Sequence, residues 1–401
     1  MQQHDGPLSR LRRGHEELVL DLLRRHGPLS RAELGARCGL SRTTLYDIVG
    51  ALVGNGAVVA SVPDAERRRR GRPVERLALN PGAGQAIGID LARRAVHVAA
   101  VNVAHEVVGS ASRPHGPDLD LAGRIALAER MVGELAGDSL RLAALSAIGV
   151  GVVGPVTPSA DGAADRERIA ELLGKRFGVP VLVDNNTRLA ALAESVWGTA
   201  TGAQDVLYLR LSHGVGGGLV VDGALHRGAH GLSGEFGHIT AVPGGPPCEC
   251  GGTGCLETVA SVGAVLAAHR AAGGAAADIA DVTAAARAGE QPAASVLAEA
   301  GRHVGAALAA VCNAVGPGVV VIGGELAAAG EALTEPVRQA LTAGLMPVSR
   351  PLVDLRPAAL GEVGAALGGI ALVLHRSPLL SRYPSHASQE GQGDGPGHDD
   401  A

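Results

Sequence analysis

Charge divides this chain of 401 residues into two unlike parts. Residues 1–80 contain 14 arginines against nine acidic residues, a net charge of +5, whereas the rest of the chain carries 21 basic and 31 acidic side chains. A basic segment on an acidic body is typical of a protein that binds nucleic acid through that segment alone. A solvated, arginine-rich surface would carry the same charge, so charge by itself leaves both interpretations open.

Apolar periodicity within residues 18–80 predicts three short helices. The first covers Leu18–Leu23 and stops at a Gly-Pro pair. Ser30 and Glu33 form a capping box for the second helix, Gly39 supplies a tight turn, and Ser41 caps a third, amphipathic helix. Helix, short glycine turn and helix is the helix-turn-helix arrangement, in which the later helix enters the major groove of DNA.

The start of the third helix carries side chains suited to reading DNA. The candidate DNA-contacting residues are Ser41, Arg42, Thr43, Thr44 and Tyr46. Arg42 can bind guanine through two hydrogen bonds, and the threonines can reach bases or phosphates. We therefore expect Arg42 to contribute most to base recognition.

A basic loop between two strand-like pieces extends this surface as a wing. The strands are expected at 57–59 and 76–79, and the segment 66–73 between them contains five arginines. Arg72 lies between Gly71 and Pro73 and can enter a minor groove, where the electrostatic potential favours arginine. A disordered basic linker is the alternative. The agreement of helix pattern, cap, glycine turn and basic loop favours a winged helix-turn-helix that binds DNA.

Beyond a glycine-rich hinge at 81–84, strand and helix patterns alternate as in α/β lobes with mixed sheets. Strands are expected at 86–91, 95–103, 106–108, 147–153, 179–183, 206–211 and 217–221, helices at 119–136 and 189–196, and further alternation from 261 to 375. With two Phe, one Trp and three Tyr, the core must consist of Ala, Val and Leu. The predicted parts are an N-terminal extension 1–17, a DNA-binding domain 18–80, a body 85–375 and a disordered polar tail 376–401.

Apolar runs and cysteine usage point to a cytoplasmic protein. The chain begins without the long apolar run of a signal peptide. The most apolar stretch, 304–324, is interrupted by polar, glycine and proline residues, so it predicts a buried helix and strand rather than a membrane span. Five cysteines in a chain of this length do not form a secreted disulfide scaffold.

A cysteine cluster is the sharpest chemical signal in the body. Cys248, Cys250 and Cys255 fall within eight positions, and His238 precedes them by ten. Three Cys and one His form a structural Zn²⁺ set, normally tetrahedral. A redox-active cysteine pair and unrelated thiols are the alternatives, but the clustering favours zinc. Cys38 and Cys312 lie in apolar helices and are expected in the core.

Glycine-rich segments beside this cluster resemble a known family. The loop 212–218 follows a strand and is suited either to phosphate approach or to a tight hairpin. The segments 222–231 and 234–238, joined to the His-Cys cluster, resemble the ROK family of repressors and sugar kinases. The segments 30–34, 39–44 and 71–73 resemble the winged helix-turn-helix of its repressors, and the resemblance runs from about Leu18 to about Leu374. It implies a two-lobed, actin-like and ribonuclease-H-like body with a sugar in the cleft.

The resemblance also implies a sugar site. The positions that match the family's sugar-binding residues are Asn185, Asn186, Glu235, His238 and Glu257. Carboxylates and amides suit vicinal hydroxyls because they supply paired hydrogen-bond acceptors and donors. His238 can bind zinc through one ring nitrogen and a hydroxyl through the other, which would couple the metal to the sugar.

Departures from the kinase pattern indicate that phosphoryl transfer has been lost. Asn186 occupies the position of the general base, and an amide has no usable basicity. Asp184 is two positions away in an extended segment, about 6–7 Å along the chain, and is not expected to replace the base. Arg93 and Arg94 stand where the kinases have small and hydroxyl residues, and His213 stands where a threonine is common.

The predicted function is therefore a zinc-containing transcriptional regulator, a repressor of sugar-related genes that responds to a sugar or sugar phosphate and has no kinase activity. It is expected to bind a palindromic operator as a homodimer or homotetramer. One alternative is an active sugar kinase with an added DNA-binding head, which ATP turnover would reveal. Another is a DNA-binding protein whose body only dimerises, for which no ligand would shift the melting temperature.

Overall fold

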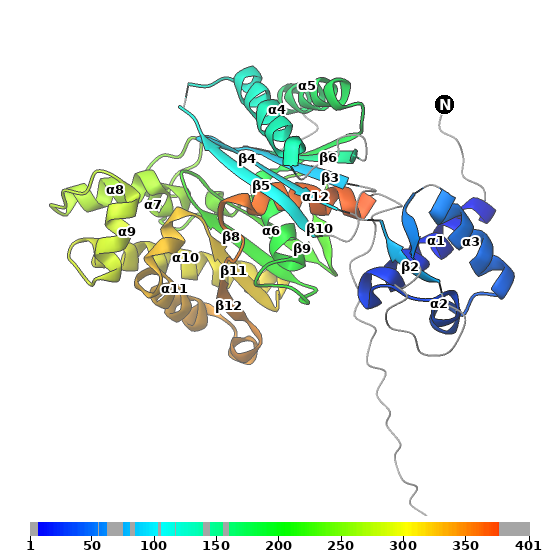
Figure 1. The fold of residues 1–401 in the computed structure, drawn as a ribbon. Helices are drawn as coiled ribbons and strands as arrows, with labels where there is room; N and C mark the ends of the chain where they lie inside the picture. Colours follow the sequence, from blue (N-terminus) through cyan, green and yellow to red (C-terminus); the bar gives the residue numbers. More distant parts are fainter. Residues whose placement is uncertain are drawn as a thin grey trace, which may run out of the picture.

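The computed structural model describes residues 7–54, 56–61, 75–80, 85–102, 106–116, 118–138, 145–154 and 160–376. A small head, residues 7–80, stands beside a larger two-lobed body (Figure 1). Arg72 and most of its loop, together with the tail from residue 377, lie outside the described residues, so their predictions stay untested. No helix within the described ranges is long and apolar enough to cross a membrane.

The head consists of three helices and one antiparallel strand pair. These are α1 (Pro7–His26), α2 (Arg31–Cys38), α3 (Arg42–Gly54), β1 (Val58–Ser61) and β2 (Arg76–Leu79). Val58 pairs with Leu79 and Ser61 with Arg76. Helix α1 begins at Pro7, so part of the expected N-terminal extension is helical. Proline is accepted in the first turn of a helix because no backbone N–H is needed there.

The turn between α2 and α3 forms as its sequence predicts. The Ser30 hydroxyl accepts a hydrogen bond from the Glu33 backbone N–H, and the Glu33 carboxylate accepts one from the Ser30 backbone N–H at 2.7 Å. Gly39 ends α2 in the left-handed conformation, with φ of 64°. The Ser41 hydroxyl then accepts from the Thr44 backbone N–H at 3.1 Å. Both helix starts are therefore capped, which fixes α3 relative to α2.

Lobe one is built on a mixed sheet with the strand order β5-β4-β3-β6-β7. Its strands are β3 (Gln85–Leu91), β4 (Ala95–Val101), β5 (Val107–Pro114), β6 (Leu145–Val152) and β7 (Val181–Asn185). Helices α4 (Leu121–Asp138) and α5 (Ala160–Phe177) cover one face, and α12 (Gly364–Arg376) covers the other (Figure 1). Helix α5 was not expected from the sequence, and β5 is longer than expected.

Lobe two has the strand order β10-β9-β8-β11-β12. Its strands are β8 (Val206–Leu211), β9 (Val215–Val221), β10 (Ala224–His226), β11 (Val319–Gly323) and β12 (Asp354–Pro357). Its helices are α7 (Glu257–Ala260), α8 (Val262–Ala271), α9 (Ile279–Arg287), α10 (Ala293–Val315) and α11 (Glu331–Gly344), with 3-10 turns η3 (Phe236–His238), η4 (Glu325–Ala329), η5 (Pro347–Leu352) and η6 (Gly361–Val363). The α/β architecture with mixed sheets is thus confirmed.

Helices α6 (Asn186–Val196) and α12 join the parts of the molecule. Helix α6 packs against α12 and also against β8 and β9 of lobe two. Ile370, Val373 and Leu374 of α12 belong to the same buried apolar cluster as Val19 and Leu20 of the head. The head and lobe one therefore share a continuous core.

Candidate functional site

Two buried polar side chains meet where β3 ends and α6 begins. The Asn186 side-chain N–H donates to Asp90 Oδ1 at 3.2 Å, and the two residues are 5% and 0% exposed. Asp90 Oδ2 has no hydrogen-bond partner within the described part of the chain. Burial raises the pKa of Asp90, while Arg210, His97 and Asn186 act in the opposite direction. This pair therefore contains a carboxyl group with an unsatisfied oxygen.

Asp184 is held by two arginines, one from α6 and one from lobe two. Its Oδ1 accepts from Arg188 Nε at 2.9 Å and its Oδ2 from Arg227 Nε at 2.6 Å. The Arg188 guanidinium, 1% exposed, also donates to the carbonyl oxygens of Gly231 and Ser233. Both oxygens of the Asp184 carboxylate are therefore occupied by guanidinium groups. The four-residue spacing of Asp184 and Arg188 could have signalled their ion pair, but the sequence interpretation missed it.

Asn185 holds the start of α6. Its side-chain oxygen accepts from the backbone N–H groups of Thr187 and Arg188 and from the Thr187 hydroxyl. Its side-chain nitrogen donates to the Gly154 carbonyl at 2.8 Å. A sugar hydroxyl at Asn185 would have to share an amide already engaged in the cap, so its predicted sugar contact stays a prediction.

Lobe two holds three of the predicted sugar-binding residues, Glu235, His238 and Glu257. The charges of His238 and Glu257 act on the Glu235 carboxyl. Glu257 Oε2 accepts from the Val215 backbone N–H at 2.8 Å, which ties α7 to the start of β9. Burial raises the pKa of Glu235, Arg188 and His238 lower it, and the Glu257 charge raises it. Of the predicted sugar residues, these three come together in lobe two and Asn186 joins Asp90 in lobe one.

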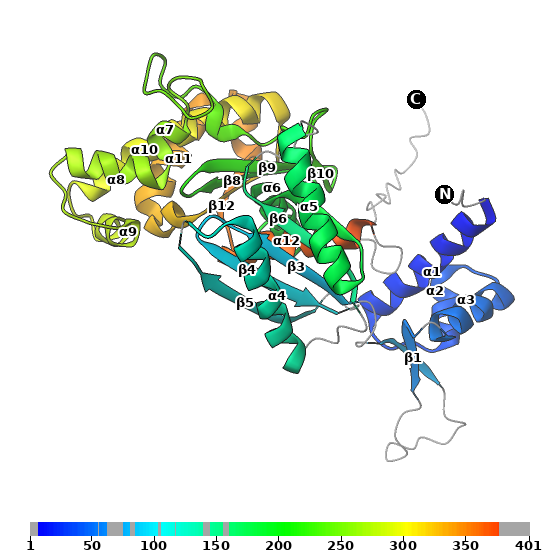
Figure 2. The same ribbon diagram turned by 90° about the horizontal axis from the view of Figure 1, so that it is seen from above.

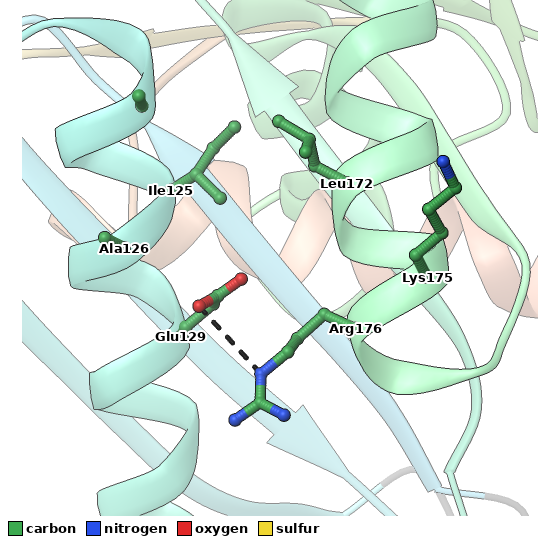
Figure 3. A pocket seen from close by; sticks show the side chains of 7 residues that line it. Ile125, Ala126, Glu129, Leu172, Lys175 and Arg176 are labelled. Carbon is green, nitrogen blue, oxygen red and sulfur yellow. Dashed lines mark ion pairs between the residues drawn. The ribbon is translucent and has the colours of Figure 1, made fainter.

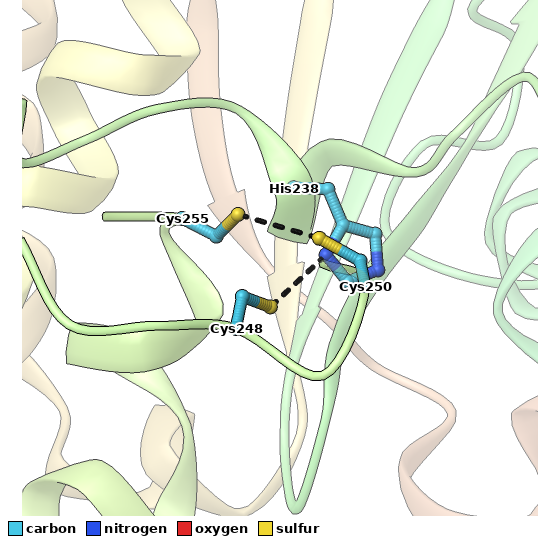
Figure 4. Close-up of side chains that lie close together, drawn as sticks. All are labelled: His238, Cys248, Cys250 and Cys255. Atoms are coloured by element: carbon cyan, nitrogen blue, oxygen red, sulfur yellow. Dashed lines mark hydrogen bonds between the residues drawn. The ribbon is translucent and has the colours of Figure 1, made fainter. Parts of the chain in front are cut away.

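His238, Cys248, Cys250 and Cys255 converge as the sequence predicts (Figure 4). Their ligand atoms all lie within 4.8 Å of one another. His238 Nδ1 is 3.6 Å from Cys248 Sγ, and the Cys250 and Cys255 sulfurs are 3.7 Å apart. In a tetrahedral zinc site, bond lengths of about 2.3 Å to sulfur and about 2.0 Å to nitrogen give S···S of about 3.8 Å and S···N of about 3.6 Å. The cluster can therefore hold a metal ion.

Helix α3, which begins with the predicted DNA-contacting residues, lies on the side of the head away from the body (Figures 1 and 2). Ser41, Arg42, Thr43 and Tyr46 are exposed, and Thr44 is half-buried. The Arg31 guanidinium stacks 4.7 Å from the Tyr46 ring centre and pairs with Glu75 at 3.0 Å. Arg42 makes no ion pair or side-chain hydrogen bond with other described residues. Its guanidinium is thus available to a partner.

The turn between β3 and β4 and the strand β8 both carry arginines. Arg93 and Arg94 are exposed in the turn between β3 and β4. Burial lowers the pKa of His213, the charges of Arg94, Arg93 and Arg210 lower it further, and the charge of Glu325 raises it. Gly324 has φ of 92°, and a Cβ there would lie 2.2 Å from the Leu211 carbonyl oxygen. Packing alone therefore requires this glycine.

An apolar groove between α4 and α5 contains none of the predicted site residues (Figure 3). It is lined by Ala122, Ile125, Ala126, Glu129, Leu172, Lys175 and Arg176. Arg176 and Glu129 form a long ion pair of 4.0 Å across it. The groove offers no set of convergent polar groups of the kind that orients a small ligand.

Comparison with known proteins gives matches along nearly the whole chain. The DNA-binding transcriptional repressor Mlc of Escherichia coli K12 is 25% identical over 94% of this chain and 97% of its own length. A glucokinase from Halalkalibacterium halodurans is 35% identical but covers 53% of this chain and 69% of its own length. The regulator match therefore includes the head, whereas the kinase match leaves almost half of the chain unmatched.

Comparison with solved structures also matches a transcriptional regulator over most of the chain. The crystal structure of a ROK family transcriptional regulator, a homologue of the E. coli Mlc protein, has a TM-score of 0.74 and 29% identity, over 90% of this chain and 96% of that chain. The sequence profile of the ROK family matches residues 86–376. The described body, with its two mixed sheets and its His-Cys cluster, lies within this range. The chain belongs to the ROK family.

Proposed function

We propose that this protein is a sugar-responsive transcriptional repressor whose head binds DNA as a winged helix-turn-helix. The observation that carries the proposal is the exposed N-terminal turn of α3, which Ser41 caps and where Arg42 forms no ion pair with another described residue. A major groove accepts such a helix, and arginine binds guanine there through two hydrogen bonds. The full-length similarity to the repressor Mlc supports this assignment.

The body binds an effector rather than phosphorylating it. Asn186 provides hydrogen bonds to a hydroxyl but no base, and Asp184 is neutralised by Arg188 and Arg227. Glu235, His238 and Glu257 supply further acceptors and donors for a sugar. A Zn²⁺ ion held by His238 Nδ1 and the three cysteines supplies structural cross-linking and no chemistry of its own.

DNA recognition requires two heads in a fixed relation. Helix-turn-helix dimers read half-sites about one helical turn, 34–36 Å, apart. We propose a homodimer or homotetramer on a palindromic operator, in which closure of the two lobes over an effector changes the spacing of the heads. The effector then releases the protein from DNA because it binds the closed arrangement of the lobes more tightly than the arrangement that fits the operator.

The first prediction concerns DNA binding. The full chain, used to select genomic fragments that are then sequenced, should enrich a palindromic site, with affinity falling steeply as salt rises because phosphate contacts release counterions. Arg42→Ala should cost about 1–3 kcal/mol on that site and relax the preference for the base it contacts. Arg113→Ala, an exposed arginine of lobe one, is the matched control. No enrichment of any DNA by the unmodified protein would exclude the proposed function.

The second prediction concerns phosphoryl transfer. ADP release coupled to a panel of hexoses and amino sugars should stay at background, because the position of the general base holds an amide. General-base assistance is worth about 10²–10⁴-fold, yet Asn186→Asp should restore at most a trace, since Arg93 and Arg94 still occupy the first phosphate turn. Sugar-dependent turnover of about 1 s⁻¹ in the unmodified protein, the low end of ordinary enzyme rates, would favour the kinase instead.

A further inference from the structure

Arg31 lies where helix α3 meets the strand pair that carries the predicted wing. It is the first residue of α2, and its guanidinium carbon lies 4.7 Å from the centre of the Tyr46 ring on α3. Its Nε donates to Glu75 Oε2 at 3.0 Å, and Glu75 directly precedes β2. One side chain of α2 therefore contacts both of the parts of the head that are expected to reach DNA.

These contacts orient the guanidinium and leave one edge of it unused. The Tyr46 ring covers one face of the group, and Glu75 occupies Nε. Neither terminal nitrogen of Arg31 forms a hydrogen bond with any residue that the structure describes, and neither is buried. The side chain as a whole is 26% exposed. Because a guanidinium is a rigid planar fork, its two terminal nitrogens present unused donors in a fixed direction.

Fold stability gives little reason for this arrangement. The side chain of Glu75 is 43% exposed, and a neighbouring pair of Arg76 with Glu33, at 3.6 Å, is 47% and 45% exposed. Ion pairs as exposed as these contribute little to folding, because water screens them and both long side chains lose freedom. What the two contacts of Arg31 provide is a defined orientation of its donors.

The position of Arg31 decides which part of DNA those donors would meet. A helix in the major groove and a wing in the adjacent minor groove have one sugar-phosphate strand between them. Arg31 lies between α3 and the base of the wing strands, so it is placed for that strand rather than for base edges. A guanidinium binds phosphate through two parallel N–H···O bonds, and a fork that is already oriented loses less freedom when it does so.

We propose that the two terminal nitrogens of Arg31 bind a backbone phosphate of the operator, while Tyr46 and Glu75 hold the guanidinium in the orientation for that contact. This inference rests on the proposed DNA-binding role of the head. Phosphate contacts fix the register of a protein on the duplex and carry no direct sequence information. Arg31 therefore sets the position of α3 on DNA, whereas Arg42 reads a base.

The first test is the salt dependence of DNA binding by the full-length protein, on the palindromic site selected from genomic fragments and on a duplex of equal length and unrelated sequence. Arg31→Gln should weaken both complexes by about 10- to 100-fold and reduce the slope of log affinity against log salt by about 0.9 for each head. Arg42→Ala should instead weaken mainly the selected site. Arg302→Gln, which removes an exposed arginine paired with Glu299 in lobe two, is the charge-matched control and should change neither complex.

The second test locates the phosphate. Uncharged methylphosphonate linkages are placed one at a time along the selected site. At one position in each half-site the substitution should weaken binding of the unmodified protein by about tenfold, and it should have no further effect on Arg31→Gln, because that contact is already absent. Glu75→Gln keeps an acceptor for Nε and removes a negative charge, so it should bind both duplexes at least as tightly as the unmodified protein.

Three results would overturn the inference: a salt slope that Arg31→Gln leaves unchanged, equal sensitivity of both proteins to every methylphosphonate, or equal weakening by Glu75→Gln and Arg31→Gln. The last would mean that the ion pair only ties the wing strands to α2. If the unmodified protein binds no DNA, the proposed function fails as well. Sequence-specific binding with an unchanged salt slope in Arg31→Gln would preserve the repressor and refute the phosphate contact alone.

Discussion

Loss of the metal should disable the effector site while leaving the head folded. His238 ends the turn η3, three positions after Glu235, and Cys255 lies two positions before Glu257. The segment between them contains no helix or strand and is held by turn and loop hydrogen bonds, such as that from the Leu256 N–H to the Ile239 carbonyl at 2.8 Å. Structural zinc contributes about 10–16 kcal/mol of apparent folding free energy in small zinc domains, so its removal should unfold this loop.

Elemental analysis of protein purified without chelator should find about one zinc per chain. Cys250→Ser should abolish it, weaken sugar binding by more than tenfold, lower the melting temperature of the body and leave affinity for DNA largely intact. Cys38→Ala, a thiol of the head that is not part of the cluster, is the matched control. Zinc-free protein with full sugar affinity would refute the structural role of the cluster.

Arg188→Leu should be the most destabilising single change outside the metal cluster. Removing one member of a buried ion pair leaves an uncompensated charge and costs about 3–5 kcal/mol. Asp184 keeps Arg227 as a partner, so we expect about 3 kcal/mol in urea unfolding. The same change frees the carbonyls of Gly231 and Ser233, so the segment leading to Glu235 should loosen and sugar affinity should fall.

Two further variants test whether the loss of stability in Arg188→Leu comes from the buried ion pair. Arg338→Ala breaks an exposed pair with Glu335 and should cost less than about 1 kcal/mol. The double change Asp184→Leu with Arg188→Leu should recover part of the stability, because it removes both charges together. A loss below about 1 kcal/mol for Arg188→Leu would mean that the buried network contributes little.

The head could be predicted well because its signals are local. The capping box of Ser30 and Glu33, the glycine turn at Gly39 and the cap at Ser41 each depend on residues within four positions. The His-Cys cluster was equally predictable, since three of its ligands lie in one loop. Such caps, turns and metal ligands can be recognised from neighbouring residues, without knowing how the strands of the sheets are arranged.

Helix α5 and the ion network could not be predicted because they depend on distant partners. Helix α5 buries a narrow stripe, with Ile169 and Leu173 as its deeply buried residues where burial is described, so its apolar period was too weak to recognise. Arg227 reaches Asp184 across 43 residues, a contact set by the approach of the two lobes. The burial of Asp90 follows from the packing of β3 inside the sheet, which no local pattern reports.

The apolar cluster shared by α12 and the head couples a movement of α12 to the head. A helix of 13 residues is about 20 Å long at 1.5 Å per residue, so a tilt of about 10° displaces its far end by about 3.5 Å. Val373 and Leu374 are buried in the same cluster as Val19 and Leu20 of the head, so a movement of α12 changes apolar contacts that extend into the head. We therefore expect a tilt of α12 to shift the head relative to lobe one by a distance comparable with the length of a hydrogen bond.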